Sequence, residues 1–518
     1  MATMTRPPRV PAIPRRVYPD RPIAAPPKAA SKATGTRKIA TNFLALSVAE
    51  ILCRGISVVV TLGLAKTLGR GGYGRIEFAF NVVFWLVLLV RDGFEVISSR
   101  EIARHPRLVR PLVNHILAVK LLLATILLIG LVAIGCATLT GPRERIVLGC
   151  YGLMLLTTAL GLDFVFRGKE RMGLVAISLC IRTALYAAGV WLLVSNESHI
   201  IWVPVCLVTG EAFGIGLVWA AYAREYGMPR PVLGARFLKV FLRRGRPVAL
   251  IQISQTVIGS VDVMLVGLMS TYASVGLYSA PYRMINAVLT FGLIFQQVVF
   301  PSMARSWRET PEAGRQALDA LVRVLVSVLI PLAVGTTLLA DSLVGWILPE
   351  DFATAGLLLA LGIWRAPLLT LAYLYQMALI SLNREIAGLR LLFAGAIGSG
   401  PLVAILGATF GLEGASAAVV IVGLVLMLAG YICLAGEGRS PAWHHHVARP
   451  LLASLAMAPV CLLLRNRNLP LAVLSGAATY ALTLLVIGGL SIRDIRAVLH
   501  PGQFGLVIAG SDEAAEPA

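Results

Sequence analysis

Residues 41–64 of the chain read TNFLALSVAEILCRGISVVVTLGL, and residues 76–97 read IEFAFNVVFWLVLLVRDGFEVI. A helix of about 20 residues crosses the roughly 30 Å of hydrocarbon in a membrane. Both stretches reach that length and are largely apolar. They therefore predict two transmembrane helices joined by a short loop.

Similar apolar stretches recur almost to the end of the sequence. Hydrophobic residues make up 57% of the 518 residues and charged residues 14%, against about 25% charged residues in a soluble domain. The alternating ten-residue pattern of a membrane barrel does not occur in the sequence. We therefore predict an all-α integral membrane protein with about fourteen spans, at 41–64, 76–97, 112–137, 146–165, 173–194, 199–220, 247–270, 278–300, 319–340, 356–381, 388–409, 413–434, 449–464 and 469–490.

The strong positive charge follows the predicted topology. The net charge is +20, which in a soluble protein would indicate a nucleic-acid partner. Nine lysines and arginines precede residue 41 and seven lie in 221–246, whereas the loops 195–198, 271–277 and 341–355 contain none. Because basic residues favour cytoplasmic loops, this alternation predicts an inner-membrane protein of a bacterium with both termini in the cytoplasm and no nucleic-acid partner.

The sequence favours a transporter over an enzyme. The longest hydrophilic segment between spans is 221–246, which is too short for a catalytic domain, and no Walker A, G-x-S-x-G or H-E-x-x-H motif occurs. Gly69 to Gly74 match the dinucleotide pattern G-x-G-x-x-G, but an apolar run of helix length precedes them instead of a strand. We expect no catalytic residues, no metal site and no cofactor other than a coupling proton or sodium ion.

A faint internal repeat divides the chain. Tyr73-Gly74 lies just before the second predicted span. Gly276-Leu277-Tyr278 lies at the start of the eighth, and Gly276 follows Gly74 by 202 residues. Six spans separate the copies, and an even number gives both the same orientation in the membrane. The predicted parts are a disordered, basic, proline-rich cytoplasmic tail (1–40), a first lobe of six spans (41–220), a cytoplasmic linker (221–246), a second lobe of six spans (247–434), two C-terminal spans (435–490) and a cytoplasmic C-terminal tail (491–518).

Polar residues inside the predicted spans follow helical spacing, which places each set on one helix face. The sets are Ser47, Glu50, Arg54, Ser57 and Thr61 in the first span, Gln252, Gln255, Gly259 and Asp262 in the seventh, and Ser279, Arg283, Asn286, Thr290 and Gln297 in the eighth. Arg182, Glu211 and Arg365 are isolated charges in other spans. Charges at this depth cost at least about 2.5 kcal/mol, so they are candidates for function.

The arginines predict the chemistry of the substrate. The central arginines outnumber the acids that we identify close to them, and a guanidinium matches phosphate oxygens. We therefore predict a cavity for an anionic, phosphorylated substrate, lined by Arg54, Arg182, Arg283, Arg365, Gln252, Gln255 and Asn286. Glu50, Glu211 and Asp262 are candidate carriers of a coupling proton or sodium ion. The structural alternative is that these groups hold neighbouring helices together.

Several short segments resemble the polysaccharide biosynthesis or oligosaccharide flippase family of the Wzx type, within the MOP superfamily that also contains the MATE exporters. They are Leu64 to Gly69 with Tyr73-Gly74, Ser99 to Arg104, Asp262 with Val275 to Ala280, Phe300-Pro301, and Gly411 to Ala415. The resemblance spans about residues 40–435 and implies a MATE-like fold of two lobes.

The resemblance also implies a function. The family moves an undecaprenyl-diphosphate-linked oligosaccharide from the cytoplasmic to the periplasmic leaflet by alternating access through a cationic cavity. Expected partners are the lipid-linked oligosaccharide, membrane lipids, and a polysaccharide polymerase or glycosyltransferases of the same pathway. The alternatives are a flippase for the peptidoglycan lipid precursor and a MATE-type, cation-coupled drug exporter, which should present acids to its cationic drugs.

Overall fold

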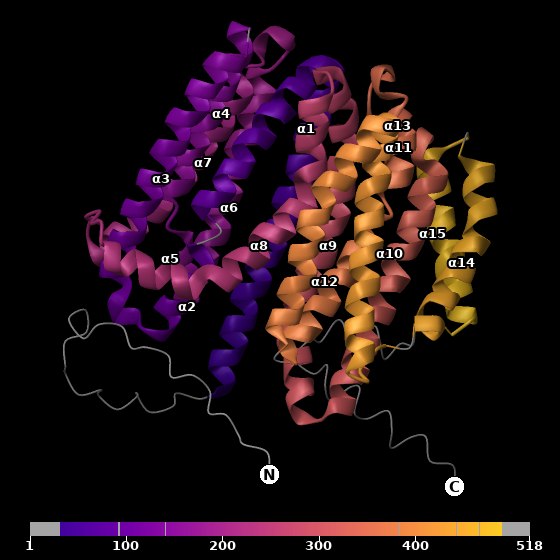
Figure 1. Ribbon diagram of the computed structural model, residues 1–518. Coiled ribbons are helices and arrows are strands. Elements are labelled where there is room, and N and C mark those ends of the chain that lie inside the picture. Colours follow the sequence, from indigo (N-terminus) through magenta and orange to yellow (C-terminus); the bar gives the residue numbers. More distant parts are fainter. Residues whose placement is uncertain are drawn as a thin grey trace.

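The computed structural model describes residues 32–91, 94–139, 141–382, 384–441, 443–465 and 467–488. Within these residues every regular element is a helix (Figure 1), which confirms the predicted fold class. The first part of the chain forms α1 (Lys32–Arg91), α2 (Glu95–Arg104), η2 (Pro106–Leu108), α3 (Val109–Thr138), α4 (Pro142–Leu160), α5 (Asp163–Gly168), α6 (Met172–Leu193), η3 (Glu197–His199) and α7 (Trp202–Tyr226). The second part forms α8 (Ala235–Met269), α9 (Tyr272–Glu309), α10 (Pro311–Ile347), η4 (Glu350–Phe352), α11 (Ala355–Gly362), α12 (Arg365–Ser381), α13 (Glu385–Gly436), α14 (Trp443–Leu464) and α15 (Leu469–Val486).

Glycines divide the two longest helices. A straight helix with the 52 residues of α13 would be about 78 Å long, more than twice the hydrocarbon thickness. Gly411 has a φ of 65° and Gly69 in α1 has a φ of 63°, a backbone conformation that glycine adopts at no steric cost. Leu46 and Phe94 pack into one hydrophobic cluster although they lie on opposite sides of Gly69. The chain therefore turns back at Gly69.

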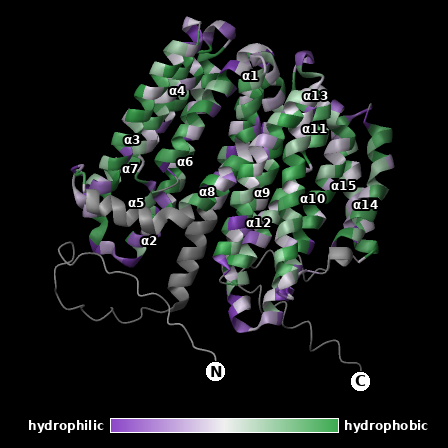
Figure 2. Cartoon of the chain, in the orientation of Figure 1, coloured by the Kyte–Doolittle hydropathy of each residue, from purple (hydrophilic) through white to green (hydrophobic). Residues whose placement is uncertain are grey.

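Eleven stretches of the described residues are long and apolar enough to cross a membrane. One of them contains the break at Gly69 and another the break at Gly411. The total of about fourteen spans stays a prediction. Hydrophobic residues predominate along the helices, as Figure 2 shows. Many large apolar side chains are exposed, among them Leu192 at 79% and Val486 at 86%. Such a surface suits lipid rather than water.

The helices form two lobes and an outer pair. Helices α1 to α7 build the first lobe and α8 to α13 the second, and α1 packs more extensively on α9 than on any other helix of the described part. Helices α14 and α15 lie at the edge (Figure 1) and contact the rest mainly through α10, where the Tyr480 hydroxyl donates to the Ser327 carbonyl over 2.6 Å.

Two of the predicted non-membrane segments contain helix. Helix α1 begins at Lys32, so residues 32–40 of the predicted N-terminal tail are helical. The rest of that tail and the predicted C-terminal tail lie outside the described residues. The predicted linker 221–246 is largely helical, and its non-helical part is 227–234. This part is tied to α3, because the Arg230 amide donates to Asn114 Oδ1 over 2.9 Å.

The two ends of the helix bundle are distinct. Helices α2 and α5 pack together at one end, named here the α2 end. The other end, named here the η3 end, contains η3, the break at Gly69 and the turn between α8 and α9. A methyl group at Gly72 would contact Glu197 of η3, and one at Gly74 would contact Tyr272 at the start of α9. Arg75, six residues after that break, contacts Glu197 of η3 and the Tyr272 ring at the start of α9.

Candidate functional site

A cavity of about 200 Å³ lies where the first lobe faces α9. Helices α1, α4, α6, α7 and α9 all contribute to its wall, so side chains from both lobes meet there. The charged and aromatic groups that line it include Glu77, Phe80, Tyr151, Arg182, Glu211 and Arg283. The cavity therefore contains two of the predicted arginines, Arg182 and Arg283.

An ion pair between Glu77 of α1 and Arg283 of α9 joins the two lobes at this cavity. Nη2 of Arg283 donates to both carboxylate oxygens of Glu77, each over 2.9 Å. The Glu77 side chain is 8% exposed, whereas that of Arg283 is 32% exposed. The side of the pair that faces the cavity is therefore mainly the guanidinium.

Arg283 has hydrogen-bonding capacity that Glu77 does not use. Both contacts to Glu77 come from one nitrogen, Nη2. Its Nε is buried and has no hydrogen-bond partner in the part of the chain that the structure describes. The guanidinium carbon lies 5.0 Å from the centre of the Phe80 ring, within cation–π range. An arginine carries five N–H donors in a planar fork, so the remaining donors can bind an oxyanion while Glu77 stays in place.

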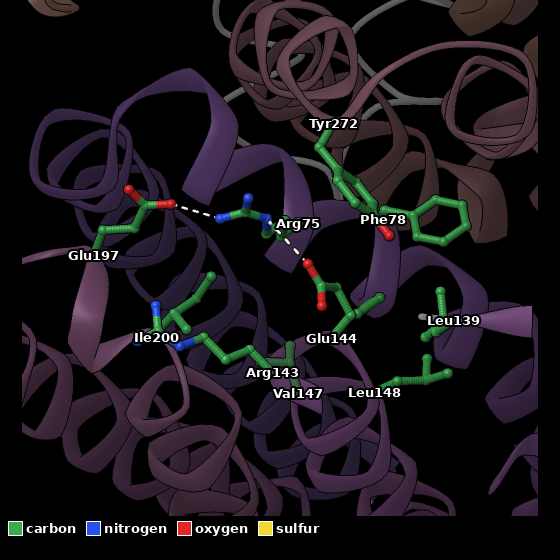
Figure 3. Close-up of a pocket in the computed structure, with 11 residues that line it drawn as sticks. Arg75, Phe78, Leu139, Arg143, Glu144, Val147, Leu148, Glu197, Ile200 and Tyr272 are labelled. Carbon is green, nitrogen blue, oxygen red and sulfur yellow. Dashed lines mark hydrogen bonds and ion pairs between the residues drawn. The ribbon is translucent and has the colours of Figure 1, made fainter. Parts of the chain in front are cut away.

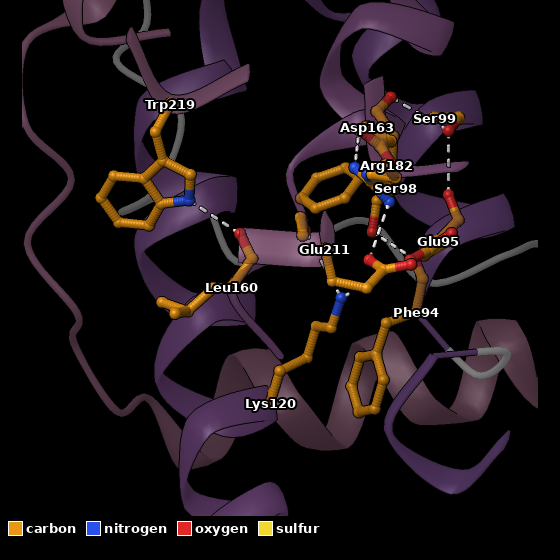
Figure 4. A network of polar contacts seen from close by, with 12 residues as sticks. Phe94, Glu95, Ser98, Ser99, Lys120, Leu160, Asp163, Arg182, Glu211 and Trp219 are labelled. Carbon is orange, nitrogen blue, oxygen red and sulfur yellow. Dashed lines mark hydrogen bonds and ion pairs between the residues drawn. The ribbon is translucent and has the colours of Figure 1, made fainter. Parts of the chain in front are cut away.

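Arg182 lies at the centre of a second cluster, in the first lobe (Figure 4). Its Nη2 donates to both oxygens of Asp163, over 3.1 and 2.9 Å, and its Nη1 to Glu211 over 3.3 Å. Its Nε donates to the Ser178 hydroxyl over 3.2 Å. All three guanidinium nitrogens thus have protein partners. Arg182 and Glu211, predicted separately for the substrate and for a coupling ion, form one ion-paired unit.

Lys120 extends the set of buried charges in the first lobe. A lysine near the cytoplasmic end of its predicted span is expected to extend to the membrane interface, but Lys120 is completely buried. Its Nζ lies 3.6 Å from Glu95 and 3.5 Å from the Gly161 carbonyl oxygen (Figure 4). The expectation is wrong because Glu95 and the end of α4 surround the amine and replace its contacts with water.

Replacing Lys120 with methionine should destabilise the protein. The change leaves the Glu95 carboxylate without its counter-ion, and breaking a buried ion pair from one side costs about 3–5 kcal/mol. We expect a clearly lower thermal unfolding temperature in detergent, and no comparable drop for Lys66→Met, which changes an exposed lysine of α1. The double variant Lys120→Met and Glu95→Gln should recover part of the loss. Equal melting of wild type and Lys120→Met would contradict the assignment.

Arg365 and Asp262 form a third pair, inside the second lobe. Arg365 Nη1 lies 3.1 Å from Asp262 Oδ2, which also accepts a 2.8 Å hydrogen bond from the Tyr278 hydroxyl. Nη2 of Arg365 donates to the carbonyl groups of Ile258 and Gly259 in α8. The Arg365 and Asp262 side chains are 2% and 0% exposed, and neither lines the cavity that contains Arg283.

The other predicted residues lie on α1, α8 and α9. Arg54 is exposed one turn before Ser57, which lines the cavity, and is close enough to Glu50 and Arg283 for electrostatic interaction. Gln255 Nε2 donates to Gln376 of α12 over 3.2 Å. Gln252 and Asn286 are partly buried.

The premise that the central arginines outnumber the acids close to them is wrong. Arg182, Arg283 and Arg365 each form an ion pair with a carboxylate. The sequence analysis missed Glu77 and Asp163, which lie at the edges of predicted spans. The sequence did contain a signal for Glu77, because this residue is one turn from Tyr73 and Gly74 of the internal repeat.

The chain has the fold of several solved membrane transporters. The lipid II flippase MurJ in an inward closed conformation superposes with a TM-score of 0.72 at 14% identity, over 86% of this chain and 98% of that one. An inward-facing multidrug resistance MATE transporter of the MOP superfamily gives 0.61 at 12% identity, over 77% and 98%. A MOP superfamily transporter from Pyrococcus furiosus gives 0.54 at 12% identity, over 79% and 98%.

The predicted MATE-like fold is therefore confirmed. No curated protein sequence matches the chain. Residues 39–307, just over half of the sequence, match the family described as "Polysaccharide biosynthesis protein", as the quoted segments predicted. The chain is thus a multi-pass membrane transporter of the flippase type, and it belongs to the polysaccharide biosynthesis protein family.

Proposed function

We propose that the protein moves an undecaprenyl-diphosphate-linked oligosaccharide from the cytoplasmic to the periplasmic leaflet of the bacterial inner membrane. The observation that carries this proposal is the exposed guanidinium of Arg283 at the junction of the lobes. Its free donors suit the oxygens of a diphosphate, because charge-assisted hydrogen bonds to phosphate are among the strong ones in proteins.

The rest of the cavity suits a sugar attached to that diphosphate. Phe80, Tyr151 and Tyr186 present rings to it, and Ser57 and Thr61 add hydroxyl groups. Aromatic faces pack on the apolar face of a sugar ring, while hydroxyl groups exchange hydrogen bonds with it. With about 200 Å³ the cavity is smaller than the roughly 300–1,000 Å³ of typical ligand sites. The lobes must therefore separate to admit a whole oligosaccharide.

The direction of transport follows from the proposed topology. The basic residues of the linker and of α2 favour a cytoplasmic location for the α2 end by the positive-inside rule, and the η3 end would then face the periplasm. Moving one charge across 100 mV is worth about 2.3 kcal/mol. The membrane potential, negative inside, therefore drives an anionic diphosphate outward.

A coupling ion would need a carboxylate that can exchange protons or sodium. Asp262 is held by Arg365, and Glu211 by Arg182. Glu50 is partly exposed and interacts electrostatically with Arg54. Of the three predicted acids, Glu50 is therefore the one that we propose for coupling. If wild-type transport depends on pH or on sodium and transport by Glu50→Gln does not, this role is supported. If Glu50→Gln keeps the ion dependence of the wild type, the role is refuted.

Proteoliposomes provide the test of the transported substrate. We expect the purified full-length protein to translocate a fluorescent undecaprenyl-diphosphate oligosaccharide, and to translocate the corresponding lipid more slowly when a neutral linkage replaces the diphosphate. Lipid II and a cationic dye serve as competing cargo in the same vesicles.

Each outcome decides between the candidates. The solved MurJ structure superposes with a TM-score of 0.72, so a preference for lipid II would move the assignment to a peptidoglycan-precursor flippase. Export of the cationic dye without lipid movement would instead indicate a drug exporter. Equal rates for the diphosphate and neutral lipids would remove Arg283 as the group that recognises the substrate.

A further inference from the structure

The closest approach of the two lobes involves two glycines at matching positions of the internal repeat. A methyl group at Gly74 of α1 would overlap the carbonyl oxygen of Tyr272 and lie 2.8 Å from the amide nitrogen of Gly276. A methyl group at Gly276 of α9 would overlap the carbonyl oxygen of Arg70 and lie 3.2 Å from the amide nitrogen of Gly74. The contact is therefore reciprocal, backbone against backbone, and neither position has room for a side chain.

The ion pairs beside this contact lie within one lobe. Arg75 forms ion pairs with Glu197 over 2.6 Å and with Glu144 over 3.5 Å, as Figure 3 shows. Both acids belong to the first lobe, so these pairs persist when the lobes move apart. Across the boundary, apolar and aromatic side chains of both lobes pack together. Among them is the Tyr272 ring, whose centre lies 5.9 Å from the Arg75 guanidinium carbon and 5.9 Å from the centre of the Phe78 ring.

This arrangement has the properties of a gate. Glycine allows helices in a membrane to approach closely, and the Cα–H···O contacts that such an approach permits are weaker than ordinary hydrogen bonds. The contact thus excludes ligand and water. The interactions that cross beside it are apolar and aromatic, and the ion pair between the lobes, Glu77 with Arg283, lies at the cavity. Glu77 lies one turn from Gly74 and Arg283 two turns from Gly276 on the same helices. The substrate site is therefore directly beneath the contact.

We propose that Gly74 and Gly276 form the periplasmic gate of the transporter. The lobes close the η3 end when the two backbones meet and open it when α1 and α9 separate there. The inference rests on the proposed function in one respect, which is the alternating exposure of the cavity to the two sides of the membrane.

The test measures the distance between the lobes. Spin labels are attached at Thr67 and Ser270, which are both exposed at the η3 end. The full chain is used, with its seven native cysteines replaced. The labelled protein is reconstituted in lipid nanodiscs without substrate. We expect one short distance with both glycines present. Gly74→Ala and Gly276→Ala should each lose that population in favour of distances several ångströms longer. Gly71→Ala, whose methyl group meets no atom within 4 Å, should retain it.

Every outcome bears on the gate. Short distances retained in both Gly74→Ala and Gly276→Ala would overturn it, and so would a loss of the short distance in Gly71→Ala. If Gly74→Ala and Gly276→Ala both fail to fold, the contact is needed for the fold and cannot be one that opens, which also overturns the proposal. The measurement uses no substrate, so its result is independent of whether the lipid-translocation assay succeeds.

Discussion

Arg283→Ala should lower the rate of translocation of the diphosphate-linked lipid by at least about tenfold in proteoliposomes. The variant removes a partly exposed guanidinium whose buried Nε has no hydrogen-bond partner within the described residues. Hydrogen bonds to charged groups contribute about 1.5–3 kcal/mol each, and about 1.4 kcal/mol corresponds to a factor of ten. Arg390→Ala, which removes an exposed arginine of α13, is the matched control and should transport at the rate of the wild type.

A structural role of Arg283 would have a different signature. Removing the arginine also leaves the buried Glu77 carboxylate without its counter-ion, which destabilises the junction of the lobes. We expect Arg283→Ala with Glu77→Gln to recover thermal stability but not transport, and Arg283→Lys to retain part of the transport because lysine keeps the charge without the planar fork. If the double variant transports at the wild-type rate, Arg283 only neutralises Glu77.

The sequence is sufficient to predict the helices but not which helices face each other. Apolar runs of span length and the basic loops predicted an all-α membrane protein, and the offset between Gly74 and Gly276 predicted two matching lobes. These signals are local or repeat at a fixed interval. In the structure the same two glycines touch, a contact that no pattern within one helix encodes.

The prediction of the site was less complete than the prediction of the fold, for a physical reason. Helical spacing shows that polar residues share a face, but it does not identify the groups opposite that face. Glu77 and Asp163 were therefore not predicted, because charges near the ends of spans cost little free energy and do not stand out as candidates for function. Arg365, a deep charge predicted to line the substrate cavity, lies beside Asp262 in the second lobe and outside the wall of the cavity that contains Arg283.

Substitution of Asp262 should affect the stability of the protein more than the coupling of transport to an ion. The Arg365 guanidinium is a permanent cation with almost no exposure, and Asp262→Ala would leave it buried without a counter-ion. Such losses cost about 3–5 kcal/mol, whereas replacing both partners with apolar residues of similar volume is often close to neutral. We expect Asp262→Ala to melt at a clearly lower temperature than the wild type, and Asp262→Leu with Arg365→Met to melt at a higher temperature than Asp262→Ala.

The same variants separate a structural pair from a coupling site. If Asp262 carries a proton or sodium ion during transport, Asp262→Asn should stay folded, transport slowly and lose its dependence on pH or sodium. If Asp262 is the counter-ion of Arg365, Asp262→Asn should lose stability, and the molecules that remain folded should keep the ion dependence of the wild type. The geometry favours the second result, because Tyr278 and Arg365 both donate to Oδ2 and the Asp262 side chain is completely buried.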